Sequence, residues 1–175
     1  MDLLIREVQL DDAEAIVSIL NPIIEAGVYT VLDAPLTAEA ERKYITNFPH
    51  RGTFYVAVHR RDKRIVGLQS IEPFVTYTRA FNHVAVLGTF VDLSHRRQGI
   101  GTRLSEVILE AARRKGYEKL FTYVRADNFE SLVFHLKLGF RIVGTAQKQA
   151  KLGQRYVDEI IIEKFLLEPF QERAD

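Results

Sequence analysis

The sequence predicts one α/β domain, on the basis of three observations. Segments with the apolar pattern of strands alternate with segments that repeat apolar residues at helical spacing. The chain has 175 residues, which is enough for one domain with a substantial core. No internal repeat, low-complexity segment or linker divides it. We therefore expect a single domain over residues 1–175, with its core spanning about residues 3–166.

The first part of the chain predicts a strand, a helix, a loop and a second helix. Residues 3–8 have the apolar pattern of a strand. Asp11 and Glu14 then stand three residues apart, as in a capping box, before an apolar face at helical spacing. Residues 27–36 are expected to form a loop, and Thr37 is placed to cap the second helix.

The middle of the chain predicts three strands. Residues 54–58 and 65–71 are rich in β-branched and aromatic side chains, and the polar turn at 60–63 joins them. Residues 73–79 form a loop, and a longer strand follows at 83–91.

The last part of the chain alternates helices with strands. One helix is expected to end near Gly116, because glycine is favoured just after a helix C-terminus. A strand follows at 120–124, and Asn128 caps a helix that ends at Gly139. Two further strands are expected, at residues 140–144 and 156–165.

Composition excludes several classes of function. The formal net charge is +1, so no overall field favours nucleic acid or membrane as a partner. The absence of cysteine excludes disulfides and thiol nucleophiles, and the five histidines lack the spacing of a metal site. No apolar run approaches the length of a membrane span, and no signal peptide is evident. We expect a cytoplasmic protein without a metal.

One glycine-rich run stands between a strand and a helix: Arg96-Arg97-Gln98-Gly99-Ile100-Gly101-Thr102. A strand, a glycine-rich turn and a helix N-terminus together present backbone N–H groups to phosphate. No lysine follows Gly101 as in a P-loop, and Leu104 stands where a dinucleotide fingerprint needs its third glycine. Taken alone, the run is explained equally well as a basic helix start.

This run resembles the Arg/Gln-x-x-Gly-x-Gly/Ala signature of the GNAT superfamily of N-acetyltransferases, whose loop holds the pyrophosphate of coenzyme A. Asn128 and the ending Lys137-Leu138-Gly139-Phe140 resemble a later helix of the same family. More narrowly, residues 5–165 are similar to the phosphinothricin N-acetyltransferase branch. The resemblance implies a mixed, mostly antiparallel sheet flanked by helices and splayed where acyl-CoA binds. It also implies a homodimer.

The resemblance implies a role for each residue that matches the family's motifs. The backbone of Thr89, Phe90 and Val91 would pair with the pantetheine amides of acetyl-CoA. The N–H groups of the 96–102 run would hold the pyrophosphate. Asn128 would hydrogen-bond the coenzyme as well as cap its helix.

The catalytic groups are less well determined. His135 occupies the position of the family's general acid, and a packed histidine bonded to a carbonyl explains it equally well. The phosphinothricin branch places a glutamate base in its long strand, where this chain has Val86. His83, Glu72 and a water chain are the candidate substitutes, and solvent-facing polar residues at strand ends explain both side chains equally well.

The acceptor side is implied to include five residues: Tyr29, Phe74, Tyr77, Arg79 and Tyr156. Arg79 is a candidate clamp for a substrate carboxylate, while surface packing or dimer contacts would explain the same residues. The leading hypothesis is an acetyl-CoA-dependent N-acetyltransferase that acts by direct transfer on a small, amino-acid-like primary amine. The alternatives are a non-catalytic acyl-CoA sensor, which Val86 motivates, and acetylation of protein N-termini or lysines.

Overall fold

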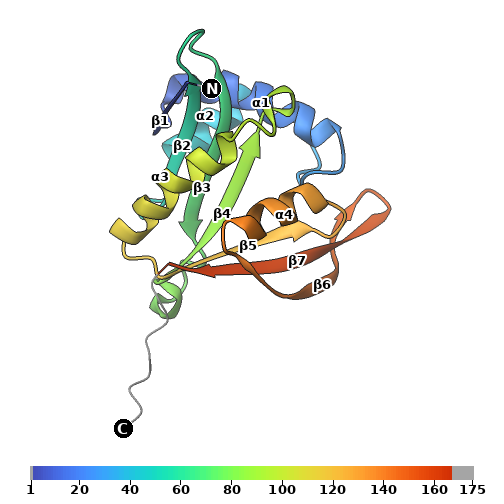
Figure 1. The fold of residues 1–175 in the computed structure, drawn as a ribbon. Coiled ribbons are helices and arrows are strands. Elements are labelled where there is room, and N and C mark those ends of the chain that lie inside the picture. The colour runs from blue at the N-terminus through green and yellow to red at the C-terminus, as the bar shows by residue number, and fades with distance from the viewer. Residues whose placement is uncertain (1, 167–175) are drawn as a thin grey trace.

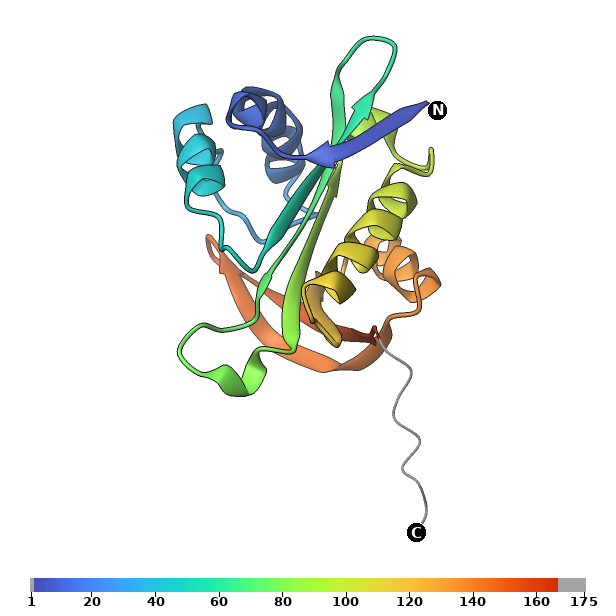
Figure 2. The same cartoon turned by 90° about the vertical axis from the view of Figure 1, so that its left-hand side faces the viewer.

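The computed structural model describes residues 2–166, which form a seven-stranded sheet with helices on both faces (Figures 1 and 2). Residues 1 and 167–175 of the expected domain lie outside the described part. The strands are β1 Leu3–Glu7, β2 Thr53–His59, β3 Ile65–Pro73, β4 Val84–Val91, β5 Lys119–Arg125, β6 Arg141–Leu152 and β7 Arg155–Phe165. Their spatial order is β1-β2-β3-β4-β5-β7-β6. Only β4 and β5 run parallel, which confirms a mixed, mostly antiparallel sheet.

Helices cover the two faces of the sheet in pairs, as Figure 2 shows. α1 (Ala13–Glu25) and α2 (Ala38–Thr46) lie on one face, and α3 (Ile100–Arg114) and α4 (Phe129–Lys137) lie on the other. None of the helices described within residues 2–166 is both long and apolar enough to cross a membrane.

The core has a layer on each face of the sheet. Ile16 and Ile23 of α1 pack against Leu68 of β3 in one layer. In the other layer, Ile108 of α3 packs with Leu120 of β5. The buried residues of each helix recur every three or four positions, so each helix presents one apolar stripe to the sheet.

β4 and β5 separate partway along their length. Residues 84–86 pair with 119–121, and beyond them the Thr122 hydroxyl donates to the Leu87 carbonyl at 2.7 Å. On the opposite side of β4, the Asp92 N–H donates to a carbonyl of β3 at 3.0 Å. Backbone groups of alternate residues face opposite sides of a strand, so Thr89 and Val91 face the gap while Phe90 faces β3.

The helix caps follow the sequence in most places. Thr37 accepts the Ala40 N–H at 3.1 Å and Asn128 accepts the Ser131 N–H at 3.2 Å, which confirms both predicted caps. Gly116 and Gly139 have φ of +79° and +84°, the left-handed conformation that favours glycine after a helix.

The capping pair predicted at Asp11 and Glu14 is wrong. The Asp12 carboxylate instead accepts the Gln9 N–H at 2.7 Å, within a 3₁₀ turn that precedes α1. Asp12 also binds the Arg6 guanidinium through two 2.7 Å hydrogen bonds. The Arg6 guanidinium on β1 binds Asp12, and this pairing depends on the fold. The sequence pattern alone did not distinguish Asp12 from Asp11 as the capping residue.

β6 is longer than the predicted strand at 140–144. It extends to Leu152 and turns at Gly153, whose φ is +60°. Its pairing with β7 is irregular between Ala146 and Ala150, and its outer residues are polar. This second half therefore lacks the alternating pattern by which a strand is predicted.

Candidate functional site

A cavity of about 610 Å³ lies between the end of β4, the 96–102 loop and α4. Ten of the eleven residues predicted to bind coenzyme A line it: Thr89, Phe90, Val91, Arg96, Arg97, Gly99, Ile100, Gly101, Thr102 and Asn128. Gln98 is not among its lining residues. The structure thus brings the strand segment, the glycine-rich loop and the α4 cap to one place.

The 96–102 loop has the backbone shape of an anion site. Arg97 and Gly99 have φ of +60° and +80°, and the chain enters α3 immediately afterwards at Ile100. Left-handed residues next to a helix start turn successive N–H groups toward one concave surface. A Cβ at Gly99 would meet nothing within 4 Å, so the requirement for glycine there is conformational rather than steric.

Gly101 is required for a different reason. A Cβ built at Gly101 would lie 2.9 Å from Cζ of Phe134, so α3 and α4 meet closely at this point. Phe134 packs on the glycine and lines the cavity as well.

Two arginines bring positive charge to the cavity. The Arg96 guanidinium lies 3.9 Å from the centre of the Tyr29 ring, which ties the 27–36 loop to the 96–102 loop. Arg97 lines the cavity, and the first turn of α3 contains no acidic residue. The positive end of the α3 dipole adds to these charges. Loop N–H groups and two cations suit a phosphate ligand.

Residues of α4 that the sequence reasoning missed also line this cavity. Phe129, Val133 and Lys137 stand four residues apart on one face of the helix, and Phe129 is 73% exposed. The sequence offered one signal for this cavity. Phe129 is a large apolar residue at the first position of α4, where no contact with the core requires it.

A smaller cavity of about 170 Å³ adjoins the first where β4 and β5 separate. Tyr29, Thr89 and His135 line both cavities. The smaller cavity adds Arg125 and Glu159, which the sequence reasoning did not single out.

His135 is a buried, neutral histidine in this setting. It is 5% exposed, and its Nδ1 lies 2.8 Å from the Ser131 carbonyl oxygen, which requires Nδ1 to carry the proton and donate. Burial lowers the pKa of His135, and the bond to Ser131 opposes that shift. The neutral ring therefore has an unprotonated Nε2, which can accept a hydrogen bond or a proton.

The two other predicted catalytic residues lie outside both cavities. Glu72 accepts a hydrogen bond from the Tyr44 hydroxyl, and burial together with this bond raises the pKa of Tyr44. His83 is exposed and precedes β4, at the end opposite to Val91. At about 3.3 Å per strand residue, His83 lies roughly 20 Å from Thr89.

Of the predicted acceptor residues, only Tyr29 reaches the cavities. Phe74 packs against two other aromatic rings at 5.3 and 5.4 Å, and Tyr77 is 82% exposed. Arg79 begins a short 3₁₀ turn at the surface, and Tyr156 lies under two lysines on the β6–β7 hairpin.

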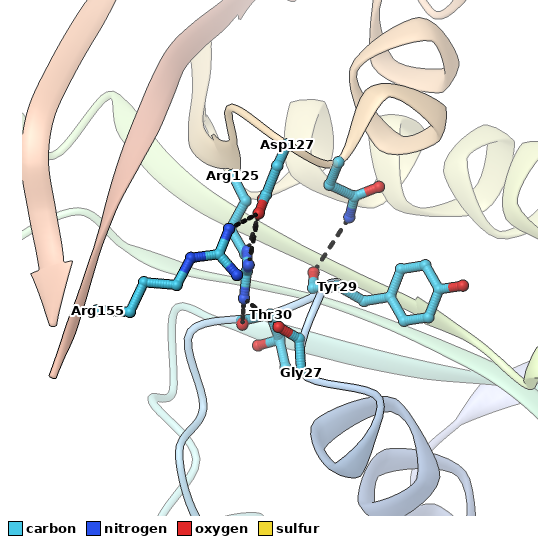
Figure 3. A network of polar contacts seen from close by, with 7 residues as sticks. Gly27, Tyr29, Thr30, Arg125, Asp127 and Arg155 are labelled. Carbon is cyan, nitrogen blue, oxygen red and sulfur yellow. Dashed lines mark hydrogen bonds and ion pairs between the residues drawn. The ribbon is translucent and has the colours of Figure 1, made fainter. Parts of the chain in front are cut away.

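A buried arginine fastens the loop that contains Tyr29 (Figure 3). Arg125 is 3% exposed and donates to both carboxylate oxygens of Asp127, at 2.9 and 2.8 Å. Its Nη1 donates to the carbonyls of Gly27 and Thr30, each at 3.0 Å. Arg155 pairs with Asp127 from outside at 2.9 Å. The Arg125 hydrogen bonds lower the pKa of Asp127 and keep it charged.

Asn128 fastens the same loop. Besides capping α4, its side-chain amide donates to the Tyr29 carbonyl at 3.1 Å. The side-chain oxygen of Asn128 thus caps α4 while its NH2 group holds the loop. Contact between Asn128 and a coenzyme remains a prediction.

A buried amide sets the direction of the Thr89 hydroxyl. The Ser105 hydroxyl donates to the Gly101 carbonyl at 2.8 Å, so Ser105 can accept a hydrogen bond from Gln69. Nε2 of Gln69 donates to Ser105 at 3.0 Å and to Thr89 at 2.8 Å. Because Thr89 accepts from Gln69, its own proton is available to donate to a group in the cavity.

Comparisons with known proteins agree with this geometry. Residues 17–140 match the model of the "Acetyltransferase (GNAT) family". A Bacillus subtilis (strain 168) protein named "Putative phosphinothricin acetyltransferase YwnH" is 29% identical over 147 residues, which cover 83% of this chain and 88% of the relative.

Solved structures resemble the whole described fold. A crystal structure named as a "putative phosphinothricin N-acetyltransferase" has a TM-score of 0.86 and 26% identity, covering 95% of this chain and 100% of that one. A Salmonella typhimurium protein named "yncA, a putative ACETYLTRANSFERASE", solved with its cofactor acetyl-CoA, has a TM-score of 0.87 at 18% identity and full coverage of both chains. The chain belongs to the GNAT family of acetyltransferases and is an acyltransferase.

Proposed function

We propose that this protein transfers the acetyl group of acetyl-CoA directly to the primary amine of a small molecule. The observation that carries the proposal is the gap between β4 and β5. One side of the gap is a strand edge whose backbone at Thr89 and Val91 is not paired with β5, although the Arg96 Nε donates to the Val91 carbonyl at 3.5 Å. A loop shaped for phosphate stands at the end of this edge.

The lining of the larger cavity fits the parts of the coenzyme. The N–H groups of the 96–102 loop bind the pyrophosphate, and Arg96 and Arg97 neutralise its charge. Thr89 and Val91 offer N–H and C=O groups to the amides of the pantetheine arm, as when an extended peptide joins a sheet edge. Phe134 and Val133 cover the apolar part of the arm.

We infer that the reacting groups of the two substrates meet in the gap. The N–H of Thr89 or Val91 polarises the thioester carbonyl, which stabilises the oxyanion that forms during attack by the amine. The Thr89 hydroxyl is free to donate a hydrogen bond to the departing thiolate. An ordinary thiol has a pKa of about 8.5, so the leaving group needs little further help.

A small acceptor suits the smaller cavity, whose volume is about 170 Å³ and which Tyr29 and Thr30 border from the fastened loop.

The family resemblance supports a homodimer. We place the protein in the cytoplasm, and a chain without disulfides is compatible with that reducing compartment.

Binding and turnover test the proposal separately. Calorimetry measures the affinity of the protein for acetyl-CoA, and release of free thiol measures turnover with a panel of amino acids, diamines and peptides. Mass spectrometry then identifies the acetylated product. We expect binding together with acetylation of a small amine; tight binding with no turnover would favour a sensor, and turnover on peptides alone would favour protein acetylation.

Charge reversal in the loop provides a sharper test of the phosphate site. In Arg97→Glu, a negative side chain at the cavity repels the pyrophosphate, and we expect the Kd for acetyl-CoA to rise at least about 10-fold. Arg103→Glu is the matched control, because Arg103 is exposed, lies outside the cavity and, among residues 2–166, pairs only with Glu106 on its own helix at 3.4 Å. Equal affinities for the two variants would contradict the assignment.

A further inference from the structure

Glu159 of β7 lies at the smaller cavity on the face of the sheet that α1 and α2 cover. It stands directly opposite Arg125 of β5, so the two side chains share one face. The alternate residues Val124 and Ile162 pack into the core on the α4 side. The larger cavity opens beside α4, so Glu159 approaches the gap from the side opposite to the predicted coenzyme site.

Glu159 has a largely buried side chain, and the nearby charge of Arg125 offsets only part of the cost of burying its carboxylate. It is 8% exposed, and within residues 2–166 it receives neither a hydrogen bond nor an ion pair. The Arg125 guanidinium opposite is already engaged by Asp127 and by two loop carbonyls, as Figure 3 shows. The carboxylate oxygens of Glu159 are open to the smaller cavity, because Oε1 of Gln69 is the one fully buried polar side-chain atom without a partner in residues 2–166. A cationic ligand in that cavity would offset the remaining cost of holding the charge there.

We propose that Glu159 binds the ammonium group of the acceptor and then takes its proton. This proposal rests on the function proposed above and names the residue that prepares the amine. It fits a chain that has Val86 where the resemblance to the phosphinothricin branch implies a glutamate, and in which Glu72 and His83 lie outside the cavities.

The proton and bond changes balance without any further reactant. The carboxylate of Glu159 takes one proton from the R–NH3⁺ group, which leaves a neutral amine with a lone pair. The nitrogen forms a bond to the thioester carbonyl carbon, and the carbon–sulfur bond breaks. The second nitrogen proton goes to the thiolate, giving an amide and a free thiol, and Glu159 returns its proton to water.

The surroundings of Glu159 shift its pKa upward, in the direction that makes its carboxylate a stronger base. Burial raises the pKa of Glu159, and the charge of Arg125 opposes that shift. The other titratable groups at the cavity are Tyr29, Tyr123 and His135, while β6 places the uncharged Ala146 opposite Glu159. Amine binding and turnover are therefore expected to fall as the pH falls through the raised pKa, because the protonated carboxyl can neither hold an ammonium group nor accept a proton.

The isosteric variant Glu159→Gln tests this role in the full-length protein. With the best amine of the panel, we expect kcat/KM to fall about 100-fold or more and the acidic limb of its pH profile to disappear. The Kd for acetyl-CoA is expected to stay within about twofold, because Glu159 does not line the larger cavity. Glu118→Gln, at an exposed residue before β5, is the matched control and should behave as the unaltered protein.

Stability separates a role in catalysis from a structural one. Removing an unpaired buried charge should leave the melting temperature of Glu159→Gln unchanged or raised, whereas loss of a structural pairing with Arg125 would lower it. The proposal is overturned if Glu159→Gln retains kcat/KM within threefold, or if the acidic limb persists there and disappears in His135→Gln. If the unaltered protein binds no acetyl-CoA, the proposed function itself fails, and this proposal fails with it.

Discussion

Gly99 and Gly101 are two residues apart, and glycine is needed at each for a different physical reason. Gly99 needs freedom of φ, because it adopts +80° with open space around it. Gly101 needs the absence of a side chain, because the Phe134 ring fills the place of its Cβ. The second glycine of the motif therefore brings α3 and α4 into close contact, in addition to its proposed role of admitting a phosphate to the backbone.

The variant Gly101→Ala should expose this coupling. Overpacking costs about 1–3 kcal/mol, and the higher helix propensity of alanine offsets up to about 1 kcal/mol of it. We expect a net loss of unfolding free energy in urea denaturation, partly recovered by adding Phe134→Leu. Gly144→Ala is the control, because a Cβ there meets nothing within 4 Å. Equal stability of the two single variants would refute the steric explanation.

Individual residues also show where a pattern is insufficient. A cap can be predicted because its bonds are local, as at Thr37 and Asn128. The roles of Arg125 and Glu159 depend on which strands become neighbours, since β5 pairs with β7 about 35 residues further along the chain. The sequence does not indicate whether a charged residue inside a strand is buried or exposed.

At the scale of elements, the loop at 27–30 is positioned by hydrogen bonds rather than by regular structure. Arg125 and Asn128 hold three of its carbonyls, and these bonds place Tyr29 against Arg96 at the larger cavity. The composition of this segment predicted a loop. Its attachment to the end of β5 and the start of α4 could not be predicted, because those elements meet the loop only in the folded chain.

The variant Arg125→Met should release this loop. It removes the donors to two carbonyls and leaves Asp127 with Arg155 alone, so we expect faster hydrogen exchange at residues 27–31 and weaker binding of acetyl-CoA. Unfolding free energy should fall by about 2 kcal/mol. Arg155→Met is the matched control, because Arg155 is exposed and surface ion pairs contribute about 0–1 kcal/mol. Unchanged exchange in the loop would contradict the anchoring role.

Elements also differ in how far the sequence predicts them. α3 combines a glycine-rich start, an apolar stripe and a C-terminal glycine, and it forms where these signals place it. The second half of β6 is polar and irregular, and it becomes a strand by pairing with β7. Tertiary pairing, rather than local propensity, creates that part of the sheet.

At the scale of the whole molecule, the interrupted pairing of β4 and β5 organises the site. Both faces of the sheet meet at the gap: the 96–102 loop and α4 approach from one side, and Glu159 from the other. The two-motif resemblance predicted the splayed sheet, and ten of the eleven residues that it assigned to the coenzyme line the larger cavity. Apart from Tyr29 and His135, it did not predict the charged and aromatic lining of the smaller cavity, because residues from β5 and β7 gather there only in the folded chain.

A crystal structure of the full-length protein with acetyl-CoA tests the central claim directly. We predict the pyrophosphate within hydrogen-bond distance of the N–H groups of the 96–102 loop. The pantetheine should lie along Thr89 and Val91, and the thioester should point toward the Glu159 side of the gap. A coenzyme bound elsewhere, or one whose thioester points away from the smaller cavity, would contradict the account of this protein given above.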